Sequence, residues 1–228
     1  MRAIAARLRH GERGMSLPEL LVAMSIFAVL ATVIVTMFSG LSRSFFADRS
    51  TSESTGIAAT AMKEVTRVIR AGTEIAVSDS PLNDPVFASA SAEGLEMRAY
   101  LDTDAVAPVP VLVRFTVDAH QRLVEERWTA RRSADVWTFP AAAATYNRTI
   151  AHSLVPRQQR DRPLFSYLDA SGEVLPLASG SIAVQDLRKI AAVQVTLTVR
   201  TSARDDVEPV MLQNSVGIPN LGIARVGL

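Results

Sequence analysis

Hydrophobic residues follow three successive patterns along the 228-residue chain. Residues 20–38 form an apolar run that contains no charged side chain. After a polar stretch, residues 57–69 place apolar side chains at the 3.6-residue spacing of an amphipathic helix, and Ala71 and Gly72 end that pattern. Further along the chain, apolar and polar residues alternate. This order predicts one long or broken helix followed by a β-rich region.

The length of the apolar run indicates a transmembrane helix. Nineteen residues at about 1.5 Å each span about 28 Å, close to the ~30 Å hydrocarbon core of a bilayer. A segment removed by ordinary signal peptidase is shorter, about 7 to 15 apolar residues, and ends in a small-x-small site. The end of this run, Phe38-Ser39-Gly40, is a poor match to such a site.

Four residues recur at every fourth position of the apolar run and its end, and they therefore lie on one helical stripe: Ala28, Thr32, Thr36 and Gly40. Small residues at this spacing let helices approach closely in lipid. The general abundance of small residues in membrane helices explains the pattern equally well.

Alternation in the remainder of the chain predicts strands. Residues 111–117 and 123–129 alternate on either side of a turn at 118–121, which predicts a hairpin, and residues 191–199 show the clearest alternation. Shorter candidate strands lie at 95–101, 136–139, 165–168 and 210–213. Because strands follow the helix without regular β-α alternation, we predict an α+β fold with an antiparallel sheet packed on the long N-terminal helix.

Charge is concentrated at the N-terminus. The chain has 24 basic and 23 acidic residues, and residues 1–14 hold Glu12 and four arginines: Arg2, Arg7, Arg9 and Arg13. Without them, 20 basic and 22 acidic residues remain, and this balance gives no general reason to expect nucleic acid or anionic lipid as a partner. The position of the arginines predicts a cytoplasmic N-terminus and an extracytoplasmic C-terminal part.

The junction between the basic segment and the apolar run contains an unusual carboxylate. Glu19 begins a predicted membrane helix, where a charge is costly unless it is compensated. Ser16 and Glu19 match the N-cap and N3 positions of a capping box, and Pro18 lies in the first turn, where its missing N–H costs little. Cleavage between Gly14 and Met15 would add a positive amine four residues before Glu19, on the same helical face or within reach of a neighbouring helix.

This junction resembles the processing site of type IV prepilins and pseudopilins, which have a basic leader ending in glycine, a hydrophobic first mature residue and a glutamate at the fifth. The resemblance implies leader cleavage after Gly14, N-methylation of Met15 and a filament assembly role for Glu19, although phenylalanine is more usual at the position of Met15. It also implies four partners: a prepilin peptidase/N-methyltransferase, other pilin or pseudopilin subunits, an inner-membrane assembly platform and the lipid bilayer.

The C-terminal half is similar to the W-type minor pilins and the J-type minor pseudopilins of type II secretion. The similarity rests on residues 164–169 with Gly172, on residues 190–199 and on an apolar strand ending near Asn214. Removing 14 residues from 228 leaves 214, which is large for a major pilin and favours a minor subunit. The expected segments are a leader (1–14), a transmembrane or filament-core helix (15–40), an amphipathic helix (41–72) and a β-rich domain (73–228).

Two function classes therefore compete. The first is a minor pilin or pseudopilin that leaves the cytoplasmic membrane for a surface or periplasmic filament, and the sequence does not separate a pilus from a type II secretion or competence system. The second is an uncleaved, signal-anchored extracytoplasmic binding or sensory module in which Glu19 is only a helix cap.

Catalytic and cofactor motifs are missing from the sequence. The absence of cysteine excludes disulfides and thiolate chemistry, and His10, His120 and His152 lack metal-ligand spacing. The chain has neither a Gly-x-Ser-x-Gly elbow nor a phosphate-binding Gly-rich loop. We therefore predict a protein that is not an enzyme and that holds no cofactor or metal.

Two weaker candidates remain. Asp84, Asp102 and Asp104 could offer carboxylates to calcium, but the pattern lacks the Gly and Glu of an EF-hand loop. Basic residues near aromatic ones could suit single-stranded DNA; these are Arg148, Arg157, Arg160 and Arg162, with Trp128 and Trp137 near Arg127, Arg131 and Arg132. The negative balance of the chain after residue 14 favours a solvated arginine-rich loop instead.

Overall fold

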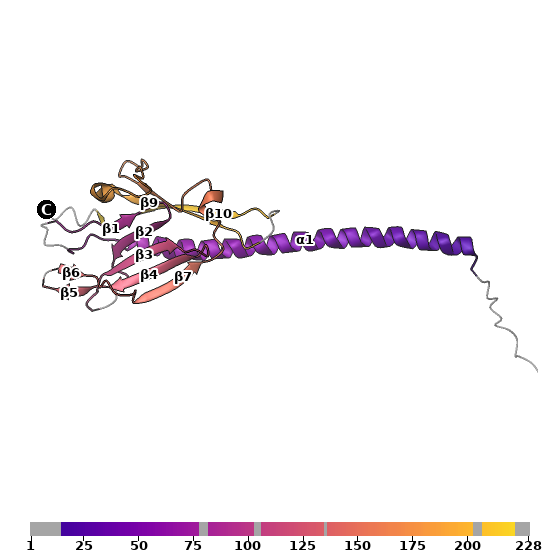
Figure 1. The fold of residues 1–228 in the computed structure, drawn as a ribbon, viewed down its shortest axis with the longest axis horizontal. Coiled ribbons are helices and arrows are strands. Elements are labelled where there is room, and N and C mark those ends of the chain that lie inside the picture. Colours follow the sequence, from indigo (N-terminus) through magenta and orange to yellow (C-terminus); the bar gives the residue numbers. More distant parts are fainter. Residues whose placement is uncertain (1–14, 78–81, 103–105, 135, 203–206, 222–228) are drawn as a thin grey trace, which may run out of the picture. The chain divides into compact units, whose positions relative to one another are not determined.

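A computed structural model describes residues 15–77, 82–102, 106–134, 136–202 and 207–221. Its longest element is α1, a 54-residue α-helix that spans Leu17–Arg70 (Figure 1). The chain divides into two compact units, Met1–Ala47 and Asp48–Leu228, so α1 contributes residues to both. Each unit is described by itself.

In the first unit, α1 exposes its apolar side chains. Phe27 is 72% exposed and Phe38 is 70% exposed, and no residue of the helix before Ser54 is buried. An 18-residue window of α1 has a mean hydropathy of 2.6 and none of it is buried within the protein. By length and composition, α1 can therefore cross a membrane.

The second unit contains the strands, all of which pair antiparallel. The larger sheet has the order β1 (Phe87–Ala90), β2 (Gly94–Ala99), β3 (Val111–Val117), β4 (Leu123–Thr129), β7 (Tyr146–Ala151). A three-stranded sheet has the order β10 (Val210–Gly217), β9 (Ala192–Val199), β8 (Phe165–Leu168). The remaining elements are the hairpin β5 (Arg131–Ser133) and β6 (Val136–Thr138), and the 3-10 helices η1 (Arg157–Gln159) and η2 (Val184–Lys189).

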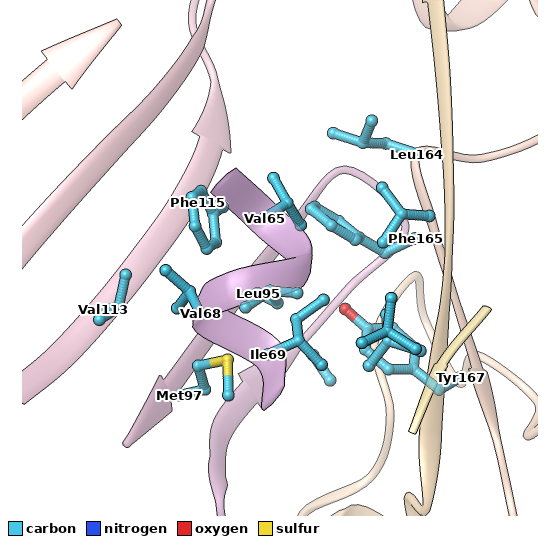
Figure 2. Close-up of a cluster of buried hydrophobic side chains, with 14 of the residues drawn as sticks. Val65, Val68, Ile69, Leu95, Met97, Val113, Phe115, Leu164, Phe165 and Tyr167 are labelled. Atoms are coloured by element: carbon cyan, nitrogen blue, oxygen red, sulfur yellow. The ribbon is translucent and has the colours of Figure 1, made fainter. Parts of the chain in front are cut away.

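The C-terminal part of α1 supplies one side of the core of this unit. Its buried residues are Ser54, Ala58, Ala61, Val65, Val68 and Ile69. Figure 2 shows Val68 pointing toward Val113 of β3, whereas Ile69 points toward Tyr167 of β8. The helix therefore contributes to a core that includes residues from both larger sheets, and the predicted α+β fold is confirmed.

The end of α1 is fixed by close packing. The helix ends at Arg70, as Ala71 and Gly72 predict, and a Cβ atom on Gly72 would lie 2.6 Å from Cε of Met97 and 2.8 Å from Cγ1 of Val86. Real Cβ atoms essentially never approach other atoms this closely, so a side chain at residue 72 would have to displace the side chains of Met97 and Val86, which glycine avoids.

The predicted hairpin is confirmed as β3 and β4, and strands occupy each of the other predicted positions. Three strands were not predicted: β1, β5 and β7. Strand β7 lacks apolar alternation because its inward-facing Arg148 pairs with Glu125 of β4 instead of contributing an apolar side chain. The expectation of a solvated arginine-rich loop is therefore wrong for Arg148.

Candidate functional site

The helix begins at the junction that the sequence singles out. Ser16 immediately precedes the first helical residue, and its carbonyl oxygen accepts a hydrogen bond from the N–H of Leu20 at 3.1 Å. Pro18 is the second helical residue, a position where no intrahelical N–H bond is lost. Gly14 lies outside the described residues, so the structure begins at the other side of the predicted cleavage site, with Met15 63% exposed.

Glu19 lies in the first turn of α1 and is exposed. It forms no ion pair with any residue that the structure describes, and the next charged residue of the helix is Arg43. The partial positive charge at a helix N-terminus favours a carboxylate in the first turn. The side chain is thus placed at the start of a long apolar helix with its charge open to another molecule.

The predicted packing stripe on α1 is exposed throughout. The hydroxyl of Thr32 donates to the carbonyl oxygen of Ala28 at 2.8 Å, and that of Thr36 donates to Val33 at 2.9 Å. A Cβ atom on Gly40 would meet nothing within 4 Å. Because both hydroxyls are satisfied within the helix, the stripe presents no unpaired polar group to lipid or to another helix.

Comparison with known families bears on this same segment. The prokaryotic N-terminal methylation motif matches residues 9–35 of the chain. This match supports a type IV prepilin-like protein. The matched residues include the Gly14–Met15 junction, Glu19 and the first part of the apolar helix. No curated protein matches the chain.

The prepilin motif has three consequences at the level of the family. Proteins that carry it are processed by a prepilin peptidase, they assemble with other pilin subunits, and they are structural subunits instead of enzymes. Together with the single N-terminal apolar helix, the motif supports a membrane-anchored, single-pass protein.

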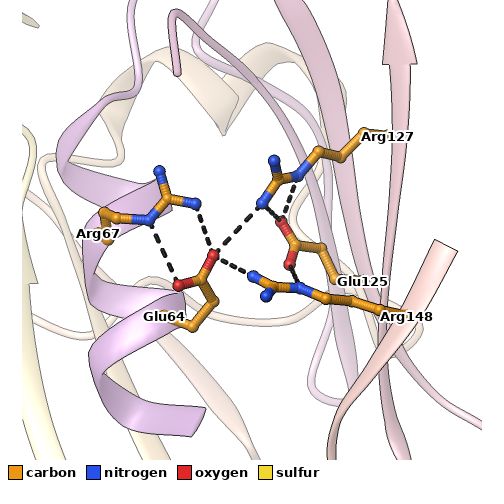
Figure 3. A network of polar contacts seen from close by, with 5 residues as sticks. All are labelled: Glu64, Arg67, Glu125, Arg127 and Arg148. Atoms are coloured by element: carbon orange, nitrogen blue, oxygen red, sulfur yellow. Dashed lines mark hydrogen bonds and ion pairs between the residues drawn. The ribbon is translucent and has the colours of Figure 1, made fainter. Parts of the chain in front are cut away.

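The β-rich unit contains a polar network that the sequence does not predict (Figure 3). Glu125 of β4 has a fully buried side chain that pairs with Arg127 at 2.6 Å and with Nε of Arg148 at 2.9 Å. Glu64 of α1 pairs with Arg67 at 2.5 Å, with Arg127 at 3.3 Å and with Arg148. Two carboxylates and three guanidinium groups thus connect α1 to β4 and β7.

This network compensates an otherwise unfavourable burial. A buried carboxylate is strongly destabilising unless its oxygens are paired, and both oxygens of Glu125 accept from guanidinium groups. The hydrogen bond from Arg67, with the positive charges of Arg67, Arg148 and Arg127, lowers the pKa of Glu64. One sequence signal was available: Glu125 follows the inward-facing Leu123 by two residues, so alternation places it on the core side of β4.

The acidic candidates for calcium are dispersed. Oδ2 of Asp84 accepts a hydrogen bond from the N–H of Val77 at 3.0 Å, Asp102 is exposed, and Asp104 lies outside the described residues. Across the described parts of the chain, no group of three or more His, Cys, Asp or Glu residues could hold a metal ion.

Two of the basic and aromatic candidates for DNA binding, Trp128 and Arg160, are largely buried. Trp128 is only 8% exposed and donates its indole N–H to the carbonyl oxygen of Ala142 at 2.9 Å, with the guanidinium of Arg114 4.7 Å from its ring centroid. The side chain of Arg160 is 3% exposed and pairs with Glu93. The solvated-loop expectation is therefore also wrong for Arg160, and Trp128 is not an open surface on which a base could stack.

Proposed function

We propose that the chain is a minor pilin or pseudopilin, a structural subunit of a type IV pilus or of a type II secretion or competence filament. The observation that carries the proposal is the methylation motif at residues 9–35, in register with a helix that begins at Leu17 and has Glu19 in its first turn. The Gly14–Met15 bond, where the leader would be removed, lies within the motif and shortly before the first helical residue.

Processing would complete the assembly site. A prepilin peptidase cuts after Gly14, and N-methylation of Met15 retains a positive terminal amine. In the filament, this amine pairs with Glu19 of a neighbouring subunit. A carboxylate in apolar surroundings is costly when unpaired, so correct pairing of subunits is favoured over other arrangements.

The apolar part of α1 serves two environments in this proposal. Before assembly it spans the cytoplasmic membrane once, with the N-terminus in the cytoplasm and the C-terminal domain outside, as the arginines of the leader favour. After assembly it packs against neighbouring helices in the filament core. The stripe from Ala28 to Gly40 provides a face on which helices can approach closely.

A minor subunit fits the chain better than a major one. The chain after Gly14 would have 214 residues, and its β-rich unit contains two separate larger sheets. The resemblance of residues 164–169 and 190–199 to W-type minor pilins and J-type pseudopilins points the same way. These residues include all of β8 and β9, which contribute side chains to the core of the β-rich unit.

The test is the N-terminus of protein extracted from membranes of cells with an active prepilin peptidase. Mass spectrometry is expected to find a chain that starts at Met15 and carries one methyl group. Gly14→Leu should block this processing, whereas Gly11→Leu, the matched control within the leader, should not. A functional chain that still carries residues 1–14 would contradict the proposal and favour the uncleaved, signal-anchored binding or sensory module.

A further inference from the structure

Strand β10 forms an unprotected edge of the three-stranded sheet. All eight of its residues pair with β9 without a register shift, and no other described strand pairs with β10. The strand has the sequence VMLQNSVG, which contains neither proline nor a charged residue. It therefore lacks the proline, the charged side chains and the β-bulge with which natural proteins often prevent an edge strand from pairing with another chain.

The other edges of the two larger sheets are less available. Strand β7 carries Arg148, which is held in the ion-pair network, and its pairing with β4 is irregular at Leu123. Strand β1 has a shifted register with β2, and Ala90 accepts a backbone hydrogen bond from Ile182 at 2.8 Å. On β8, Leu168 forms a bridge with Val174. Among these edge strands, only β10 combines a regular ladder on one side with a second side on which no described strand pairs.

A groove of about 650 Å³ runs between β10 and the C-terminal part of α1. Its apolar lining includes Ala59, Met62 and Leu212, and Asn214 of β10 donates a hydrogen bond to the hydroxyl of Thr66 at 3.3 Å. The groove thus offers both apolar surface and main-chain groups of a strand edge to a second polypeptide.

Positive charges line this groove on the side of the helix. Lys63, Arg67 and Arg70 are spaced four and three residues apart, which places them on one helical face. Arg67 pairs with Glu64, but Lys63 and Arg70 form no ion pair with any acidic residue in the described parts of the chain. On the outer face of β10, Arg162 donates to the side-chain oxygen of Gln213 at 2.5 Å. Cations therefore flank the edge strand on both faces.

We propose that β10 and this groove bind an extended, acidic segment of another polypeptide, which adds a strand to the sheet. Main-chain hydrogen bonds to β10 would supply affinity, an apolar side chain would cover Met62 and Leu212, and a carboxylate would pair with Lys63 and Arg70. A nucleic acid would use the cations but would leave the strand edge unpaired. The proposal depends only on residues of the β-rich unit and is independent of leader cleavage and of Glu19.

The experiment uses the full chain in membranes from cells that express its natural partners. The chain has no cysteine, so Met211→Cys, at an exposed position of β10, provides a unique site for a thiol-reactive benzophenone. Val184→Cys is the control, because Val184 is 81% exposed in η2, away from β10. Light should give an adduct from Met211→Cys alone, and mass spectrometry should locate the link in a segment of a different protein that contains Asp or Glu.

Charge reversal tests the second half of the proposal. Lys63→Glu with Arg70→Glu should reduce the adduct about tenfold, since repulsion replaces attraction in the groove. Arg49→Glu with Arg131→Glu, at two exposed arginines outside the groove, should leave it unchanged. If the first pair alters tryptophan fluorescence, which reports the fold of the β-rich unit, the milder Lys63→Gln with Arg70→Gln takes its place and should give a smaller loss.

Several results would overturn the proposal. These are no adduct at Met211→Cys, equal adducts at both cysteines, an adduct with lipid, nucleic acid or a second copy of this chain, or an adduct whose yield is the same in all charge variants. Each of these outcomes is compatible with a normal N-terminus at Met15, so failure here is distinguishable from failure of the proposed function.

Discussion

The two parts of α1 share one secondary structure but carry side chains suited to two different environments. Between Leu17 and Ala47 no residue is buried, and every turn exposes apolar side chains. Between Asp48 and Arg70 only one face is apolar, and that face is buried against two sheets. Backbone hydrogen bonding is the same in both parts. The distribution of side chains therefore determines whether the helix packs on its own chain or on something else.

The charged residues of the two parts differ in the same way. Glu64 pairs with Arg67 and with Arg127 and Arg148 of the β-strands, so these interactions are completed when the chain folds. Glu19 has no partner among the described residues. Glu64 and Arg67 of the second part thus contribute to the stability of the folded chain, whereas Glu19 of the first part has no such role among the described residues.

The largest expected effect is the loss of assembly in Glu19→Ala. Removing the carboxylate removes the group that would pair with the terminal amine of a neighbour, so incorporation into sheared filaments, measured by immunoblot, should fall to background. Glu19→Gln, which keeps the shape and removes the charge, should do the same. Glu53→Ala is the control and should assemble normally, because Glu53 is an exposed glutamate in the part of the same helix that belongs to the β-rich unit. Normal assembly of Glu19→Ala would show that the two parts of α1 do not differ in the way proposed.

The next effect concerns stability. Glu125→Ala leaves the guanidinium groups of Arg127 and Arg148 without their buried partner, and we expect a loss of about 3–5 kcal/mol in the free energy of unfolding. Both tryptophans lie in the β-rich unit, so their fluorescence during denaturant titration in detergent reports on that unit. Glu126→Ala, at the outward-facing neighbour on the same strand, should cost less than ~1 kcal/mol. Equal losses from the two variants would contradict the role assigned to the network.

A matched pair of isoleucines tests the helix directly. Ile69→Ala removes a fully buried side chain from the core and should destabilise the β-rich unit by about 2–5 kcal/mol. Ile34→Ala removes a side chain that is 65% exposed, and the same titration should change by no more than about 0.5 kcal/mol. A substantial loss from Ile34→Ala would mean that the first part of α1 also supports the fold of the second unit.

The sequence was sufficient for the elements whose residues follow a simple period. The apolar positions of residues 57–69, the hairpin of β3 and β4 and the strand at β9 could be predicted because their inward faces are mostly apolar. Strand β7 and the network could not. Arg148 and Glu125 face inward as charged residues, and their pairing depends on the register between β4 and β7, which local patterns do not specify.

The N-terminal site and the edge of β10 also differ in whether the sequence alone identifies them. Gly14, Met15 and Glu19 could be singled out because their spacing along the chain carries the information, and Glu19 forms no ion pair with a described residue that would add to it. The open edge of β10 could not be recognised from residues 210–213, which predicted a strand but gave neither its neighbours nor its place beside Lys63 and Arg70. Sequence spacing predicts sites that act through local order, whereas sites that depend on sheet order require the structure.

The smallest expected effect is a pH dependence of stability that comes from Glu64, in the part of α1 that packs on the sheets. The lowered pKa of Glu64 means that the folded state binds this proton less tightly than the unfolded chain does. The stabilisation by Glu64 is therefore complete above the unfolded pKa of about 4.5 and is lost as the pH falls through the lower, folded pKa. In denaturant titrations, wild type should exceed Glu64→Gln in stability near pH 7, and this difference should shrink steadily below pH ~4.5. A difference between wild type and Glu64→Gln that grew with acid would contradict the direction of the shift.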